Sequence, residues 1–424
     1  MKVRQVLKLA AGLGLAALLG LGVLLARELW GGPSRASAAP TVAGAAAADA
    51  ATLARGAYLA RLGNCAGCHT AQGGAPLAGG RPIVTPFGTV FSSNLTPDAD
   101  TGLGAWSAED FWQALHHGRG RDGRLLLPAF PFTAFTQVTR ADSDALYAHL
   151  MSQPALRYTP PPHALRFPYG TQLAQAAWRL LYFTPAEPEL SAATGTDPVQ
   201  RGSYLVNGLG HCAACHAPRS ALGGPAAGLI GGLMPGEGWW APPLALSAGP
   251  EAAAEWVQLL RTGQSARGST SGPMAEVVLH STQHWRAEDL QAAAAYLQTL
   301  PPVALPSSGR ASPAPAALLS QGQSLYTTHC ADCHGAQGQG AAGAYPPLAG
   351  NPTVLQPTAI NLMLMVRQGG FAPATQAHPQ PYGMPPLDLS DAEMAALLSF
   401  VRQSWGHQAS AVSELEVWRW TAHH

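Results

Sequence analysis

The chain carries one pentapeptide pattern three times, and the three copies contain all six of its cysteines. Cys-x-x-Cys-His is the attachment signature of c-type haem. Two thiols three positions apart on a helical turn can each form a thioether to one vinyl group of the same haem, and the adjacent histidine then lies beneath the iron as its proximal ligand. The copies are Cys65-Ala66-Gly67-Cys68-His69, Cys212-Ala213-Ala214-Cys215-His216 and Cys330-Ala331-Asp332-Cys333-His334. We therefore predict three covalently bound haem c groups, attached through these six cysteines, with His69, His216 and His334 as iron ligands.

Other uses of paired cysteines fit this pattern less well. Disulfide frameworks do not typically consist of three identical pentapeptides that use every cysteine. A structural zinc site needs four ligands, and each pentapeptide supplies three. A thioredoxin-type redox pair needs one motif within a βαβ unit rather than three motifs on helices. Haem attachment is therefore the favoured interpretation.

The charge of the chain excludes one broad class of function. Its 24 Lys and Arg residues balance 24 Asp and Glu residues, and charged residues make up only 11% of the 424-residue sequence. Such a chain has no basic surface field that would release counterions from phosphates. We therefore expect no nucleic-acid partner.

The N-terminal segment, residues 1–50, predicts export of the remainder of the chain. Lys2, Arg4 and Lys8 precede an uninterrupted apolar run from Leu9 to Ala26, an order typical of a secretory signal or a membrane anchor. Ala36-Ser37-Ala38 offers a cleavage site, but the run is longer than the ~7–15 residues of a signal peptide and close to the ~20 of a spanning helix. A cleaved signal and a retained anchor both stay open, with residues 31–50 as a flexible tether.

Each motif lies within the same order of expected helices. A leading helix contains Gly56, Gly202 or Gly322, a middle helix ends at Gly118, Gly263 or Gly369, and an apolar-faced helix closes each unit. Ser107 with Asp110 and Ser390 with Glu393 are expected capping boxes. We therefore predict an all-α fold of three tandem class I cytochrome c domains, at 51–185, 186–303 and 304–424, behind the signal or anchor segment. Residues 301–316, rich in Pro, Ala and Ser, are the expected linker to the third domain.

Two methionines are candidates for the sixth iron ligand. A low-spin electron-transfer haem uses a second axial ligand, and methionine raises its reduction potential. Met274 and Met384 follow Gly263 and Gly369 in stretches rich in Pro and Gly that we expect to be loops. By contrast, Met363, Met365 and Met394 lie on expected helices, where methionine fills the core.

The first domain has no methionine at the corresponding position. There Phe130 precedes Pro131 as Met384 precedes Pro385, so that phenylalanine takes the ligand position. Met151, His116, His117 and His149 are the other candidates, and each fits a packing, capping or surface role better. The sequence leaves the first haem bis-His, differently ligated or open.

Beyond the haem motifs, the chain resembles the triple-haem cytochrome c subunits of membrane-bound bacterial dehydrogenases, including those of quinoprotein alcohol dehydrogenase, gluconate 2-dehydrogenase and related molybdenum aldehyde or isoquinoline oxidoreductases. The resemblance runs from about residue 52 to 415. It rests on collinear motifs, among them Thr85-Pro86-Phe87-Gly88, Asn94-Leu95-Thr96-Pro97-Asp98, Cys215-His216-Ala217-Pro218-Arg219, Gly272-Pro273-Met274-Ala275-Glu276, Tyr345-Pro346-Pro347-Leu348 and Val401-Arg402-Gln403-Ser404-Trp405-Gly406.

The resemblance implies a function, partners and a location. It implies a subunit on the periplasmic side of the bacterial inner membrane, anchored or peripherally associated, that takes electrons from a catalytic dehydrogenase subunit of the quinoprotein, flavoprotein or molybdenum type. It implies ubiquinone or another electron carrier as the acceptor, and Met274 and Met384 as axial ligands. Alcohol-oxidising members have methionine at the position of Phe130, whereas members paired with molybdenum enzymes often have phenylalanine there, which weakly favours the second group.

We expect electron transfer and no substrate chemistry on this chain, because no nucleophile, acid–base pair or phosphate loop stands out beside the haem motifs. One alternative is a peroxidase- or reductase-like enzyme that uses an open first haem. A second is a dihaem-type oxidase subunit, which three motifs argue against. The segment 166–183, with an apolar stripe formed by Leu173, Ala176, Ala177, Leu180 and Leu181, is expected at the seam between the first two domains, with membrane or partner contact as the alternative.

Overall fold

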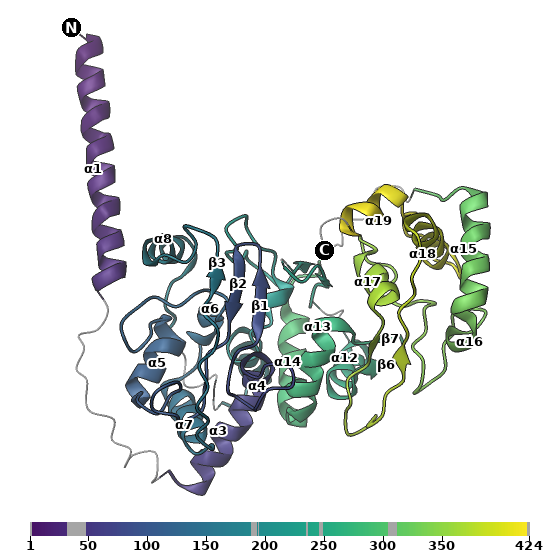
Figure 1. Cartoon of the computed structure of the whole chain (residues 1–424), viewed down its shortest axis with the longest axis horizontal. Helices are drawn as coiled ribbons and strands as arrows, with labels where there is room; N and C mark the ends of the chain where they lie inside the picture. Colours follow the sequence, from purple (N-terminus) through teal and green to yellow (C-terminus); the bar gives the residue numbers. More distant parts are fainter. Residues whose placement is uncertain are drawn as a thin grey trace.

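Three crossed helix pairs organise the computed structural model (Figure 1). The model describes residues 2–31, 48–187, 193, 195–234, 236–245, 249–303 and 312–421, with side chains from Gly12 onward. Most of the expected tether, the possible cleavage site at 36–38 and half of the expected linker at 301–316 lie outside the described residues. The pairs are α3 (Ala50–Leu62) with α7 (Arg140–Met151), α10 (Pro198–Asn207) with α14 (Ala287–Thr299), and α15 (Ala316–His329) with α18 (Asp391–Gln403).

A glycine lies at each of these three crossings. A Cβ atom at Gly56, Gly202 or Gly322 would overlap the backbone oxygen of a residue on the facing helix. Those facing residues are Ala145, Ala292 and Ala396. The repeated glycine of the leading helices therefore lets two backbones approach closely, in the same way in all three units.

Gly322→Ala is expected to destabilise the third unit by about 1–3 kcal/mol, because the added methyl group must push α15 away from α18. Gln323→Ala is the matched control, since Gln323 is exposed on the same helix and its change is expected to stay within about 0.5 kcal/mol. Guanidinium unfolding of both variants, followed by visible absorption, measures the difference. Equal stability of the two variants would contradict the close crossing.

Short helices carry the cysteine motifs, and each lies in the sequence between the two helices of a crossed pair. They are α4 (Cys65–His69), α11 (Ala213–His216) and α16 (Ala331–His334), and each follows the leading helix of its unit. The middle helices are α5 (Ala108–His117), α12 (Pro250–Thr262) and α17 (Ile360–Gln368). The predicted capping boxes are confirmed: Ser107 caps α5 with Asp110, and Ser390 caps α18 with Glu393.

Short strands accompany this helical frame and were not anticipated. β1 (Pro82–Thr85), β2 (Gly88–Phe91) and β3 (Ala164–Leu165) form an antiparallel sheet. The other strands have two residues each and form antiparallel pairs: β4 (Gly232–Leu233) with β5 (Trp240–Ala241), β6 (Gln264–Ser265) with β7 (Gly268–Ser269), and β8 (Gly370–Phe371) with β9 (Gly383–Met384). The fold is therefore mainly helical rather than purely so. Such short strands leave no period-two pattern in a sequence.

The buried apolar side chains of the described residues form two cores rather than three. One contains residues of both the first and the second unit, from Leu59 to Leu297. The other lies within the third unit, from Tyr326 to Val417, and includes residues of α19 (Glu414–Thr421). The first two units therefore share one core, and the third has a core of its own.

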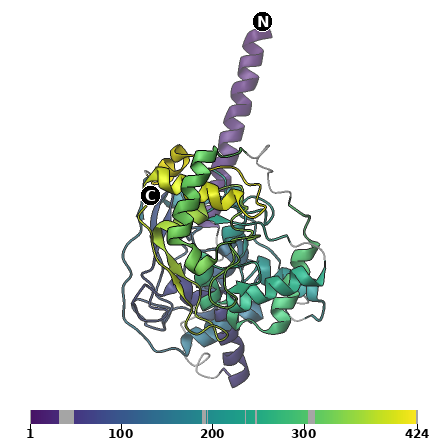
Figure 2. The same ribbon diagram turned by 90° about the vertical axis from the view of Figure 1, so that its right-hand side faces the viewer.

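Helix α1 (Lys2–Trp30) projects from the folded body in both views (Figures 1 and 2). Its Gly12–Trp30 segment is long and apolar enough to cross a membrane, and none of that segment is buried. The last turns of α1 lie against α8 (Gln172–Tyr182).

The expected seam helix α8 is only partly as predicted. Its aromatic edge lies at the boundary of the first two units, where Trp178 Nε1 donates to the Leu222 carbonyl at 3.0 Å. Of its apolar stripe only Ala176 is buried, whereas Leu173 is 57% and Leu181 64% exposed. Gln175 and Arg179 are buried instead, and Arg179 pairs with Glu28 of α1.

Candidate haem-binding sites

Each motif places its two cysteines at the ends of one helical turn and its histidine directly after them. All six cysteines are free thiols. Burial raises the pKa of Cys65, Cys212 and Cys215 to about 12, and that of Cys330 to about 11. A redox-active Cys-x-x-Cys pair has a lowered thiol pKa instead. The buried environment of these four thiols therefore does not fit a redox pair.

The three motif histidines share one hydrogen-bond arrangement. The Nδ1 atom lies 2.7 Å from the Ser93 carbonyl for His69, 2.6 Å from the Pro242 carbonyl for His216, and 2.9 Å from the Pro346 carbonyl for His334. A carbonyl oxygen only accepts, so Nδ1 carries the proton and Nε2 keeps a lone pair. Burial lowers the pKa of all three rings, which keeps them neutral at pH 7. Each ring thus presents a metal-binding nitrogen in a fixed orientation.

Sequence reasoning missed these carbonyl partners. Two of them belong to repeated segments, Pro242-Pro243-Leu244 and Pro346-Pro347-Leu348, and the third to Ser93-Asn94-Leu95. In each unit a leucine lies two residues after the residue whose carbonyl accepts. A comparison of the three units could have found this shared pattern. The thioether positions and the fixed Nε2 lone pairs fit a c-type haem at each motif.

Phe130 and Met274 follow a hydrogen bond that the first two units share, at the same spacing. After the middle helix, the Leu126 N–H donates to the Gly118 carbonyl at 2.9 Å, and the Thr270 N–H donates to the Gly263 carbonyl at 2.8 Å. Phe130 and Met274 each follow four residues later. Met274 was expected in a loop but lies in the first turn of α13 (Gly272–His280), because Pro273 at a helix start needs no partner for its missing N–H.

Met384 lies in β9, opposite Gly370, rather than in an irregular loop. Its side chain is partly buried against the core of the third unit. Met363 and Met394 are 4% and 0% exposed, as expected for packing residues. Ligation of the second and third irons by Met274 and Met384 stays a prediction.

The other candidate ligands of the first unit have packing partners. His116 stacks on Trp112, with ring centroids 4.3 Å apart, and the His117 ring meets the His116 ring edge-on, with centroids 4.5 Å apart. His149 lies at the crossing of α3 and α7 beside Gly56. Met151 packs against the first core.

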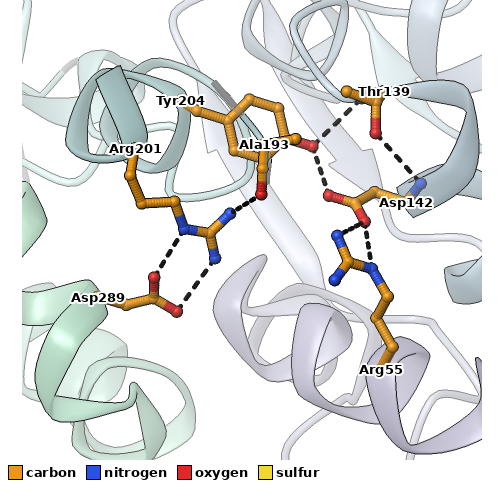
Figure 3. Close-up of polar contacts among 7 residues, drawn as sticks. All are labelled: Arg55, Thr139, Asp142, Ala193, Arg201, Tyr204 and Asp289. Carbon is orange, nitrogen blue, oxygen red and sulfur yellow. Dashed lines mark hydrogen bonds and ion pairs between the residues drawn. The ribbon is translucent and has the colours of Figure 1, made fainter. Parts of the chain in front are cut away.

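Two buried carboxylates join the first two units in a reciprocal way. Figure 3 shows the contacts of Asp142 and the pair of Arg201 with Asp289. Asp142 of α7 accepts from Arg55 Nε of its own unit at 2.6 Å and from the Tyr204 hydroxyl of the other unit at 2.7 Å. Asp142 is fully buried. Arg55 and Tyr204 come from the two leading helices, so one carboxylate fixes the position of three helices.

Asp289 of α14 repeats this arrangement in the second unit. It accepts from Arg201 Nε at 2.7 Å and from the Tyr58 hydroxyl of the first unit at 2.5 Å. Burial, and then the neighbouring carboxylate, raise the pKa of Tyr58 and Tyr204, so both hydroxyls stay protonated and donate. Arg55-Gly56-Ala57-Tyr58 and Arg201-Gly202-Ser203-Tyr204 therefore do two tasks: the arginine pairs within its unit and the tyrosine crosses to the other.

The haem motif of the first unit is also tied to the second unit. Arg81 Nη1 donates to the Gly67 carbonyl within the first motif at 2.8 Å, and its Nη2 donates to Glu276 on α13 at 2.5 Å. Between the second and third units, the backbone N–H of Trp240 donates to Asn361 Oδ1, and Asn361 Nδ2 donates to the backbone carbonyl of Trp240, both at 2.8 Å. Side chains close to the motifs thus connect all three units.

Comparison with known proteins decides the family. The family model described as cytochrome c matches residues 319–405. The protein named alcohol dehydrogenase (quinone), cytochrome c subunit, of Komagataeibacter europaeus is 37% identical over 397 residues, which cover 85% of this chain and 82% of the relative. The gluconate 2-dehydrogenase cytochrome c subunit of Pantoea cypripedii is 35% identical over 398 residues, which cover 86% of this chain and 88% of the relative. This chain belongs to the family of dehydrogenase cytochrome c subunits.

The family extends to longer proteins. A nicotinate dehydrogenase subunit of Pseudomonas putida is 38% identical over 385 residues, which cover 87% of this chain but 32% of that protein. As a dehydrogenase cytochrome c subunit, this chain binds haem c covalently and serves electron transfer rather than substrate oxidation. The predicted family and general function are therefore confirmed, and the alternative of an independent haem enzyme is not favoured.

Proposed function

We propose that the chain is a three-haem cytochrome of three tandem cytochrome c domains, which carries electrons from the catalytic subunit of a dehydrogenase to ubiquinone or another carrier. The observation that carries this proposal is the repeated histidine geometry: each Cys-x-x-Cys-His motif has its Nδ1 atom bound to a backbone carbonyl at 2.6–2.9 Å. Each haem iron, when bound, accepts and releases one electron.

The residues of the chain position and tune these centres. His69, His216 and His334 hold the proximal side through Nε2, and the six motif cysteines fix the orientation of each porphyrin through thioethers. Arg81 and the Trp240–Asn361 pair hold successive motifs in one body. Intramolecular steps then need no diffusional encounter.

The units differ in the sixth ligand. We propose that Met274 and Met384 ligate the second and third irons, and that the first iron has no sulfur ligand because Phe130 takes the position of Met274. Two of three haems then have methionine ligation, which raises the reduction potential of those two. The oxidised protein is expected to show the sulfur-to-iron charge-transfer band at two thirds of the intensity per haem of a fully His/Met-ligated cytochrome.

The family supports a proposal for the location and the partner. We propose that the haem units lie on the periplasmic side of the bacterial inner membrane. This location fits both c-type haem attachment and a membrane-spanning α1. We propose that the units lie next to a catalytic subunit of the quinoprotein, flavoprotein or molybdenum type. The phenylalanine at position 130 supports a molybdenum partner without selecting its substrate. The identity shared with a nicotinate dehydrogenase subunit adds nicotinate to the candidate substrates.

The complex isolated from native membranes in mild detergent tests the proposed function. A dehydrogenase subunit is expected to co-purify, and one of its candidate substrates (an alcohol, a sugar acid, a sugar, an aldehyde or nicotinate) is expected to reduce the haem absorption bands. Addition of a short-chain ubiquinone is then expected to reoxidise them. A chain that purifies without a dehydrogenase, or whose bands respond to no such substrate, would contradict the proposal.

Met384→His is expected to lower the reduction potential of one haem by a sizeable part of the ~0.8 V range that axial ligands span. The imidazole replaces the methionine sulfur and stabilises the ferric state. Met363→Leu is the matched control, because Met363 is buried in the same unit and its substitution conserves volume. Spectroelectrochemical titration measures both, and an unchanged potential in Met384→His would refute sulfur ligation by this residue.

A further inference from the structure

We propose that α1 is retained as a membrane anchor and that α8 lies in the boundary between lipid headgroups and acyl chains of the same bilayer. This inference rests on the proposed membrane location and extends it to a defined lipid-facing surface. Its evidence is the polar contact between α1 and the first unit, the reversed polarity of α8, and the orientation of the two helices.

The first step is the polar contact that holds α1. The Glu28 carboxylate of α1 accepts a hydrogen bond from Arg179 Nε at 2.8 Å and lies 3.6 Å from Arg119 Nη2. Arg119 also donates to the Glu28 carbonyl at 2.6 Å. The side chain of Arg179 is 4% and that of Arg119 10% exposed.

Loss of residues 1–38 would remove the carboxylate from this site. Two guanidinium groups would then remain side by side without Glu28 and without the cover of α1. Burial, and then the charge of Arg179, already lower the pKa of Arg119. Removal of one partner from a buried ion pair is strongly unfavourable. The first unit is therefore built to hold α1, which selects the retained anchor over the cleaved signal.

The second step is the polarity of α8, which is reversed for a helix of a soluble domain. Its inward face carries Gln175 and Arg179 together with the small Ala176. Its outward face carries Leu173, Leu180 and Leu181, which are 57%, 36% and 64% exposed, with Ala177 also exposed between them. No charged residue lies on this outward stripe.

The apolar surface continues from the stripe to neighbouring segments. Phe167 is 87% and Leu222 46% exposed. An apolar cavity of about 240 Å³ opens beside α8 and is lined by Phe87, Pro168, Trp178 and Leu181. An apolar patch of this kind marks a surface that is covered in the native setting.

The third step is the orientation of the helices, which selects lipid as the partner. In Figure 1, α1 runs up the page and α8 is seen nearly end-on beside its lower end, so the axis of α8 runs across that of α1. If α1 crosses the bilayer, α8 lies parallel to its surface at the point where α1 leaves it. An uncharged leucine stripe at this depth fits the acyl boundary, where amphipathic helices bind.

The opposite end of the molecule provides an internal reference. Helix α3 lies at the end away from α1 in both views (Figures 1 and 2). It has exposed positions, such as Ala51 and Ala54. If α1 crosses the bilayer, these positions lie in water and away from lipid.

The full chain, purified with its haem groups and reconstituted in phosphatidylcholine–phosphatidylglycerol vesicles, tests the inference. A phospholipid with a photoactivatable group in its acyl chain is the probe, and labelled peptides are mapped by mass spectrometry. We expect peptides from residues 1–38 in the purified chain, and label on α1 and α8 but not on α3. A mature chain that begins after residue 38, or label on α8 no higher than on α3, would overturn the proposal.

A double variant separates lipid contact from a structural effect. L180E/L181E is expected to reduce the label on α8 about tenfold, because two carboxylates are expelled from the acyl boundary, while the haem spectrum stays unchanged since both leucines are exposed. Ala51→Glu with Ala54→Glu on α3 adds the same charge and is expected to leave the label on α8 unchanged. Equal label on α8 in both double variants would overturn the lipid contact, whatever the outcome of the electron-transfer test.

Discussion

Replacement of Cys330 and Cys333 by alanine is expected to lower covalently bound haem from three groups per chain to two, while the remaining two stay attached in a folded body. The third unit has a hydrophobic core of its own, and the first two units share the other. Loss of one thioether-bound haem therefore unfolds at most the third unit. Haem per chain is measured by absorbance of the pyridine complex after extraction with acidic organic solvent.

Replacement of Cys65 and Cys68 by alanine is the informative comparison. The first unit shares its core and two buried carboxylates with the second, so loss of its haem is expected to destabilise both units. We expect protease digestion to remove the second unit in this variant but to spare the first two units in the Cys330/Cys333 variant. Equal resistance of the two variants would show that the units are independent.

Asp142→Ala is expected to destabilise the joined first two units by roughly 2–4 kcal/mol, because it leaves the buried Tyr204 hydroxyl without its acceptor and Arg55 without its carboxylate. The estimate is below the full value for a buried ion pair, since the Arg55 side chain is 44% exposed and can turn to water. By the reciprocal geometry, Asp289→Ala is expected to cost a similar free energy of unfolding.

The matched control for Asp142→Ala lies on the same helix. Asp144 pairs with Arg140 one turn away, and both side chains are 45% exposed, so Asp144→Ala is expected to cost about 0.5 kcal/mol or less. Guanidinium unfolding followed by tryptophan fluorescence compares the two variants. A cost for Asp142→Ala no larger than that for Asp144→Ala would show that the carboxylate does not join the units.

The local order of helices was predictable from the sequence because it is encoded in short segments. The motif helices, the capping residues Ser107 and Ser390, and the glycine that ends each middle helix all occupy neighbouring positions in the chain. Met274 was misplaced in a loop because Gly and Pro punctuate turns and helix starts alike.

Long-range features were not predictable in the same way. Arg55 and Tyr58 were recognised as a repeated segment, but nothing in one sequence says that the arginine pairs within its unit while the tyrosine crosses to Asp289. The apolar stripe of α8 was recognised as well, yet periodicity cannot say whether such a face meets a core or a bilayer. The orientation of this face depends on the ion pair between Glu28 and Arg179, which lie 151 residues apart in the sequence.

The mass of the intact chain tests the central claim most directly. The chain is purified from a host that matures c-type cytochromes, denatured in acidic organic solvent and analysed by mass spectrometry. The account predicts the polypeptide mass plus three haem groups that survive denaturation, one for each Cys-x-x-Cys-His motif. A mass equal to the bare polypeptide, or to the polypeptide with one or two haem groups, would contradict it.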